Sequence, residues 1–363
     1  MLRIVGSREI TEILMFFVIV QFVGLLLVMM NVGFSTLGTI RAGISSDQST
    51  YLSYLFDAIL VLIFAFVIIR RHRHHYTSMD GNRLFLVMEV VVITLTSYFT
   101  FMFIFALFLP ASSYLYYALS LGCAVLLILL KERTLFFRNA ATTVSSIGVG
   151  LFLAMYLGFL YTLALLFVVA IYDYFSVFVS KSMIKLAKAI DKRNVAFLIK
   201  VESVRDLPPG SFSKKELKEY LSYIHSNHED KNPIFKKILE EGDVPVVSRL
   251  ELGEGDLDLP LMVVASSFLT YTNPFVSVTI VAGATIGLLA TLLIMKAYQR
   301  PMPAIPPLFA SIAITTGLVS LRSGYHSITM NLGLVALGIA VMLVVLIRVF
   351  RDGSKDRKRP QTQ

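Results

Sequence analysis

Charged residues are scarce in this sequence, and it contains a single cysteine. Of its 363 residues, 16% are charged and 56% are hydrophobic. Soluble domains average about 25% charged and about 45–50% apolar residues, so the composition argues against a soluble globular domain and against intrinsic disorder. One cysteine, Cys123, excludes an internal disulfide framework and a cysteine-cluster zinc site; within its apolar run it is expected to be a small buried hydrophobe. The composition predicts a polytopic membrane protein.

Eight apolar runs give the chain its hydrophobic character. They cover residues 13–30, 52–69, 84–109, 114–130, 144–180, 252–294, 304–321 and 328–347. A helix needs about 20 apolar residues to cross a bilayer, and at about 1.5 Å per residue two of these runs are too long for one crossing. We expect the fifth run to fold back near Gly158 and the sixth at Asn273-Pro274. The sequence therefore predicts ten spans. The first is expected to be retained, because no small-residue cleavage site follows it.

Basic residues test this topology, because cytoplasmic loops accumulate Lys and Arg. With the N-terminus inside, 31 of the 33 basic residues fall on the inner side, and only Arg41 and Arg322 fall outside. The sequence thus predicts a multi-pass protein of the cell membrane, with its N-terminus and the loop 181–250 in the cytoplasm. This orientation and contact with anionic lipid explain the net charge of +9. We expect the lipid bilayer as a partner and no nucleic acid.

The loop 181–250 is the only sizeable hydrophilic segment. Residues 183–190 continue the preceding helix in an amphipathic pattern, and Pro208-Pro209-Gly210 then interrupts the chain. Ser213 and Glu216 resemble a capping box that opens a short helix to about Ser226. The loop has neither a Walker motif nor a GxGxxG sequence after a strand. We expect a tethered loop with one or two surface helices.

Three histidines lie in the sequence Arg71-His72-Arg73-His74-His75, after the second span. Such a run could bind a metal, but its arginines and its lack of carboxylate partners favour a solvated segment that faces lipid headgroups. We expect no metal and no cofactor.

Acidic residues inside the apolar runs are the main functional candidates, because a carboxylate near the bilayer centre costs about 2.5–3.5 kcal/mol. Asp57 and Glu89 lie near the beginnings of their spans, where they can reach the interface, and we interpret them as structural or modulatory. Asp173 lies near the inner end of the sixth span, and Asp256 lies near the inner start of the seventh. These two acids therefore share a depth in the inner leaflet.

Three short motifs surround these acids in order along the chain. They are Tyr172-Asp173, Gly253-x-Gly255-Asp256 and Pro303-Ala304-Ile305. They resemble the YD, GxGD and PAL motifs of the presenilin and signal peptide peptidase family of intramembrane aspartyl proteases, and are most similar to archaeal presenilin-type homologues. Three departures accompany the resemblance: Glu254 stands at a usually apolar position, Ile305 replaces leucine, and the tenth span lies outside the family pattern.

The resemblance implies an all-α, presenilin-like nine-helix bundle, to which a tenth C-terminal transmembrane helix is added. In that reading, the chain divides into five regions. They are 1–142 with helices 1–4, 143–180 with helices 5–6 and the YD motif, 181–250 as the cytoplasmic loop, 251–321 with helices 7–9 and the other two motifs, and 322–363 with the extra helix and a basic tail.

Two neighbouring carboxyls can divide the labour of peptide hydrolysis. When the two carboxyls lie close together, repulsion between their negative charges disfavours the state in which both are ionised. The pair therefore shares one proton and supplies one base and one acid. We assign Asp173 and Asp256 to this dyad, while Gly253 and Gly255 remove bulk beside Asp256. The expected activity is that of an aspartic-type endopeptidase cleaving transmembrane helices of single-span proteins or peptides.

Four prolines crowd the segment before the ninth span, at positions 301, 303, 306 and 307. They remove backbone donors, and we expect an extended segment in which Pro303-Ala304-Ile305 pairs with an unwound substrate strand. Two alternatives are weighed against the protease. A proton- or cation-coupled transporter also uses paired intramembrane acids, but predicts internal repeats and acids at the bilayer midplane. A scaffold would tolerate loss of both acids.

Overall fold

The structure is a computed structural model that describes residues 7–33, 80–109, 114–131, 133–180, 198–207, 244–298, 302–325 and 327–357. These ranges form eight helices and two strands. The helices are α1 (Ser7–Gly33), α4 (Asp80–Phe105), α5 (Tyr114–Leu130), α6 (Leu135–Phe178), α10 (Gly255–Tyr271), α11 (Pro274–Tyr298), α12 (Ile305–Ser323) and α13 (Ile328–Arg357). The expected helical membrane-protein fold is confirmed, and the two strands are an addition to it. The predicted span 52–69, Asp57 and the histidines at 72, 74 and 75 lie outside the described residues.

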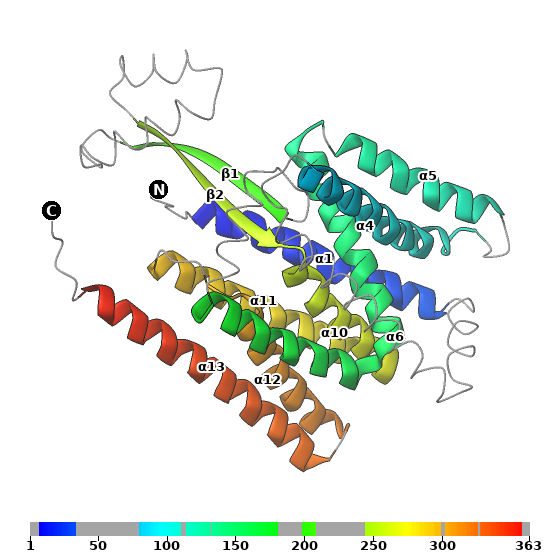
Figure 1. Ribbon diagram of the computed structural model, residues 1–363. Coiled ribbons are helices and arrows are strands. Elements are labelled where there is room, and N and C mark those ends of the chain that lie inside the picture. The colour runs from blue at the N-terminus through cyan, green and yellow to red at the C-terminus, as the bar shows by residue number, and fades with distance from the viewer. Residues whose placement is uncertain are drawn as a thin grey trace.

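Both predicted fold-backs are confirmed. Gly158 interrupts α6 with φ 68° and ψ 169°, a backbone conformation that is essentially restricted to glycine. The two halves of α6 therefore run in different directions (Figure 1). At the second site, α10 ends at Tyr271, Thr272 adopts a left-handed conformation, and α11 begins at Pro274.

The sequence did not predict the antiparallel hairpin of β1 (Leu198–Leu207) and β2 (Val244–Gly253). The expected amphipathic continuation of the preceding helix over 183–190 lies outside the described residues. The expected helix that ends near Ser226 lies outside the described residues. Over residues 199–202 and 249–252, apolar and polar residues alternate along both strands, and Ile199, Val201, Leu250 and Leu252 are buried in the main core. The hairpin forms because one of its faces can pack on the start of α1 (Figure 1).

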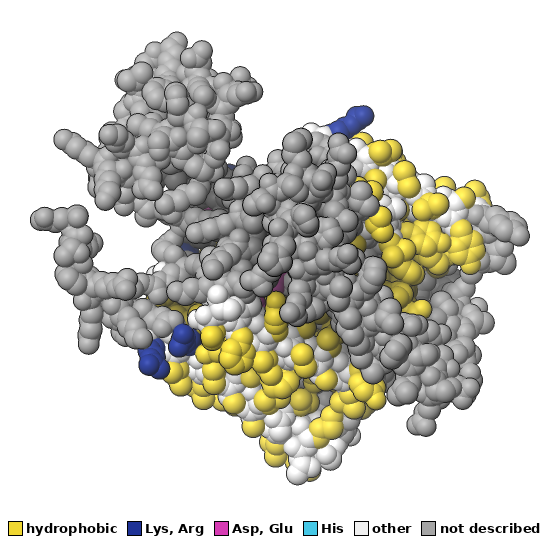
Figure 2. All heavy atoms as spheres, viewed as in Figure 1, with side chains coloured by type: hydrophobic (Ala, Val, Ile, Leu, Met, Phe, Trp, Pro, Cys, Tyr) yellow, Lys and Arg dark blue, Asp and Glu magenta, His cyan; other side chains and the backbone are white. Residues whose placement is uncertain are grey.

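The helix α10 is the centre of the bundle and packs against α1, α6 and α11. Glycines allow this close approach: a Cβ atom at Gly24 or Gly150 would run into the side chain of Leu261. The outer surface is apolar instead of charged, and Figure 2 shows hydrophobic side chains over most of the described face. Exposed Leu, Ile, Val and Phe side chains on several helices fit a surface that faces lipid.

The tenth predicted span is α13, which lies along α12 (Figure 1). Glycines again set the distance, since a Cβ atom at Gly338 would lie 2.6 Å from the Ala310 carbonyl oxygen. Near its other end, Arg348 Nη2 donates a hydrogen bond of 3.4 Å to the Phe178 carbonyl oxygen at the end of α6. The added helix therefore contacts the second half of α6, which carries Asp173.

Candidate active site

Asp173 lies one turn before the end of α6, and 6% of its surface is exposed. Its Oδ2 accepts a hydrogen bond of 3.3 Å from the Ile305 N–H, and the Ala304 N–H also interacts with this carboxyl group. Both donors belong to the first residues of α12, where backbone N–H groups have no partner within the helix. The start of α12 thus holds the Asp173 side chain, much as helix N-termini hold anions.

Asp256 lies in the first turn of α10 and is partly exposed. Its carboxyl group accepts a hydrogen bond from the Gly253 N–H and interacts electrostatically with Asp173. A Cβ atom at Gly253 would lie 3.4 Å from Asp256 Oδ2. The structure therefore brings together the two acids and the Pro303-Ala304-Ile305 segment, which are far apart in the sequence.

The other motif residues have distinct surroundings. A Cβ atom at Gly255 would meet nothing within 4 Å, so this glycine leaves open space beside Asp256. Pro303 is buried, whereas Tyr172 is 66% exposed and faces away from the core. Tyr172 is the one motif residue whose side chain the structure leaves at the surface of the bundle.

A buried amide supports the start of α10. Pro260 lies inside this helix and lacks the N–H that would bond to the Asp256 carbonyl. One residue further on, Gln21 of α1 donates a hydrogen bond of 2.9 Å to the Leu257 carbonyl oxygen. The interrupted first turn of α10 is thus fixed from a neighbouring helix.

Further carboxyl groups lie on the other side of this turn. Glu254 accepts a hydrogen bond from Ser145 and interacts electrostatically with Asp258, which is 9% exposed. The Ser145 hydroxyl also hydrogen-bonds to Thr96 at 2.6 Å. A polar layer therefore joins α4, α6 and α10 near Asp256. It includes Glu254, the residue at which the GxGD-like motif differs from the family pattern.

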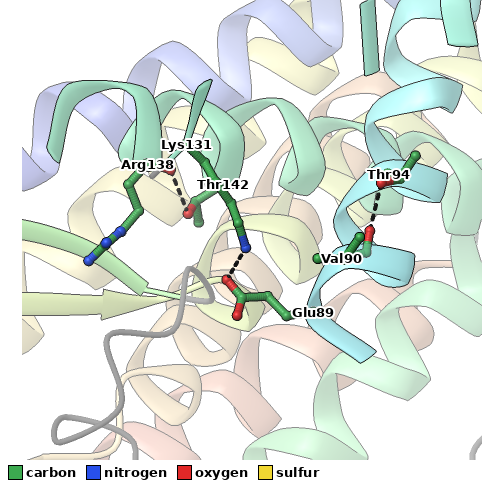
Figure 3. Close-up of polar contacts among 6 residues, drawn as sticks. All are labelled: Glu89, Val90, Thr94, Lys131, Arg138 and Thr142. Atoms are coloured by element: carbon green, nitrogen blue, oxygen red, sulfur yellow. Dashed lines mark hydrogen bonds and ion pairs between the residues drawn. The ribbon is translucent and has the colours of Figure 1, made fainter. Parts of the chain in front are cut away.

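Glu89, at the edge of this polar layer, forms a buried ion pair. Lys131 Nζ lies 2.7 Å from Glu89 Oε1, and the two side chains are 4% and 8% exposed. Figure 3 shows the ammonium group of Lys131 pointing at this carboxylate. The ion pair agrees with the sequence-based interpretation of Glu89 as a structural or modulatory residue. Among the described residues, no group of three or more His, Cys, Asp or Glu side chains is placed to hold a metal ion.

Sequence reasoning missed two residues near the site, Gln21 and Asn139. Asn139 of α6 hydrogen-bonds to the backbone of Lys200 in β1. Both are single amides within apolar or helical stretches, and their partners are backbone groups 236 and 61 residues away. Their polarity inside a membrane helix is the one signal that could have identified them.

Comparisons with known proteins show the family and the fold of the chain. Residues 14–324 match the family described as "Signal-peptide peptidase, presenilin aspartyl protease". The fold is similar to a solved structure of a presenilin family intramembrane aspartate protease, with a TM-score of 0.53 and 19% identity over 86% of this chain and 98% of the other. At that identity the likeness shows the fold alone. A search of curated proteins finds no match.

Proposed function

The chain belongs to the signal-peptide peptidase and presenilin aspartyl protease family and is an intramembrane aspartic endopeptidase, and we propose that Asp173 and Asp256 are its catalytic dyad. The observation that carries the proposal is the meeting of Asp173, Asp256 and the start of α12 at one place. The family match supports proteolysis over the transporter and scaffold alternatives.

The dyad would act through one shared proton. The ionised carboxylate takes a proton from water as the water oxygen attacks the scissile carbonyl carbon, while the protonated carboxyl gives its proton to the carbonyl oxygen. The tetrahedral diol then collapses and its C–N bond breaks. The amide nitrogen gains a proton from the protonated carboxyl of the dyad, and a hydroxyl proton of the diol passes to the other carboxylate. The open space at Gly255, where a Cβ atom would meet nothing within 4 Å, supports access of water to the reacting bond.

The substrate must be unwound where it is cut, and an unwound strand in a membrane needs backbone partners. Pro303-Ala304-Ile305 was expected to supply them, but the N–H groups of Ala304 and Ile305 are directed at Asp173. We therefore propose that this segment positions the Asp173 side chain. Strand addition fits β2 better, because β2 is an outer strand of a two-stranded sheet and leads directly to Gly253.

The substrates would be single-span proteins or peptides with their N-termini outside. This follows from the distribution of basic residues, which favours a cytoplasmic N-terminus and a cytoplasmic 181–250 segment in the cell membrane. Preferential cleavage of substrates inserted in the reverse orientation would contradict this part of the proposal.

The test is cleavage of a labelled single-span peptide by the purified chain reconstituted in lipid. Asp173→Asn and Asp256→Asn keep the side-chain shape but cannot act as acid or base, and each is expected to lower kcat by about 1,000-fold or more. Asp258→Asn is the matched control, since it lies two residues from Asp256 on the other side of the helix, and it should retain cleavage. Wild-type rates in either dyad variant would refute the assignment.

A further inference from the structure

Asn139, in the first half of α6, forms two hydrogen bonds to a single residue of β1. Its Nδ2 donates to the Lys200 carbonyl oxygen at 2.8 Å, and the Lys200 N–H donates to its Oδ1 at 3.1 Å. Both residues are buried, with 5% and 2% of their surfaces exposed. A side-chain amide offers a donor and an acceptor, as a peptide group does. Asn139 therefore takes the place that a neighbouring strand would occupy beside Lys200.

These two bonds fix which residues of the hairpin direct their backbone N–H and C=O groups toward the partner strand and which direct them away from it. In an antiparallel pair, the N–H and C=O of one residue point either both toward the partner strand or both away from it. Both groups of Lys200 are directed at Asn139, so they point away from β2. Lys200 is the register partner of Glu251, and these two residues form a pair without mutual backbone hydrogen bonds.

The same phase reaches the active site two residues later. Leu198 pairs with Gly253, and because the pattern repeats every second residue, the Gly253 N–H must also point away from the partner strand. It is directed at the carboxyl group of Asp256. A slip by one residue would exchange the two directions along β2, and the Gly253 N–H would then face β1 instead of Asp256.

An ion pair couples the strands between these points. Lys200 Nζ lies 3.7 Å from Glu251 Oε1 across the hairpin. The backbone of Lys200 is thus bound to α6 and its side chain to β2, two residues before Gly253. A continuous path of contacts therefore leads from Asn139 through Lys200 and β2 to Gly253.

We propose that Asn139 is a positioning residue of the protease, which closes the sheet on the β1 side and fixes β2 so that the Gly253 N–H meets Asp256. The proposal rests on the proposed function, in which Asp256 belongs to the dyad. Without the amide, the buried N–H and C=O of Lys200 lose their partners, which is costly. The hairpin must then shift to satisfy them, and Gly253 moves with it.

The experiment compares Asn139→Leu, which removes both bonds and keeps the same number and branching of side-chain heavy atoms, with Asn139→Asp, which keeps an acceptor for the Lys200 N–H. Asn31→Leu is the matched control, because Asn31 is equally buried and bonds to backbone carbonyls of α1 and α4, away from the hairpin. We expect Asn139→Leu to lower kcat by about 10- to 100-fold, with KM changed by less than about twofold. Hydrogen exchange of the Lys200 amide should become faster in Asn139→Leu and stay unchanged in Asn31→Leu.

Three results would overturn the inference: wild-type kcat in the Asn139 variants, a rise in KM alone, or an equal loss of kcat in Asn31→Leu. If Asn139→Leu does not fold, the kcat of Asn139→Asp decides by the same criteria. Asp256→Asn is measured in the same assay. Cleavage by Asp256→Asn would refute the proposed function, whereas an inactive Asp256→Asn beside fully active Asn139 variants would refute this inference alone.

Discussion

The ion pair of Lys131 and Glu89 shows how buried charges neutralise each other in this bundle. The two charges are buried together at 2.7 Å, and removal of one partner takes away the close counter-charge of the other. We expect Lys131→Met to lower the free energy of unfolding by about 3–5 kcal/mol. The double variant Glu89→Leu/Lys131→Met should be clearly more stable than Lys131→Met. Reversible unfolding in mixed micelles measures the free energy of unfolding of both variants. Equal stability of the single and double variants would contradict the expectation.

The sequence predicted that Asp173 and Asp256 lie close together, because acidic residues are rare in apolar runs and these two belong to a recognisable order of motifs. It could not identify Gln21 or Asn139, since an amide that binds a distant backbone group has no characteristic spacing. It also could not show that the N–H groups of Ala304 and Ile305 are directed at Asp173. That arrangement depends on how α12 meets α6, which is a property of the packing.

At the scale of elements, Gly158 determines the shape of α6. Its φ of 68° with ψ of 169° is strained for any residue with a Cβ atom, although a Cβ atom would meet no neighbour within 4 Å. We expect Gly158→Ala to lower the free energy of unfolding by about 1–3 kcal/mol. Gly122→Ala is the control, because Gly122 lies in the regular helix α5 and also has open space around it. If Gly122→Ala lowers the free energy of unfolding as much as Gly158→Ala does, the backbone conformation at Gly158 is not the cause of the loss.

Helices and their interruptions were predictable because apolar run length, proline and glycine act locally. The hairpin was not, because its strands are separated by 36 residues, from 208 to 243, and gain stability by packing on α1. Short alternating segments beside a membrane span read equally well as amphipathic helix or as loop. Tertiary contacts decide between these states, so the sequence alone could not.

For the whole molecule, the ten predicted spans place α13's two ends on opposite sides of the membrane. Cys123→Ala provides a background without cysteine, into which Ser323→Cys or Ser354→Cys is introduced. We expect a membrane-impermeant thiol reagent to label Ser323→Cys in intact cells and Ser354→Cys only after permeabilisation, because the basic tail should be cytoplasmic. The opposite labelling pattern would contradict the predicted orientation.

The direction of α13 has a practical consequence. This helix returns the chain toward the side where α1 begins (Figure 1), so the start of α1 and the end of α13 lie on one side of the bundle. Two fragments of a split fluorescent protein, one fused to each end, would share a compartment and could reassemble without crossing lipid. A single fluorescence reading would then report molecules whose two ends share one compartment in living cells.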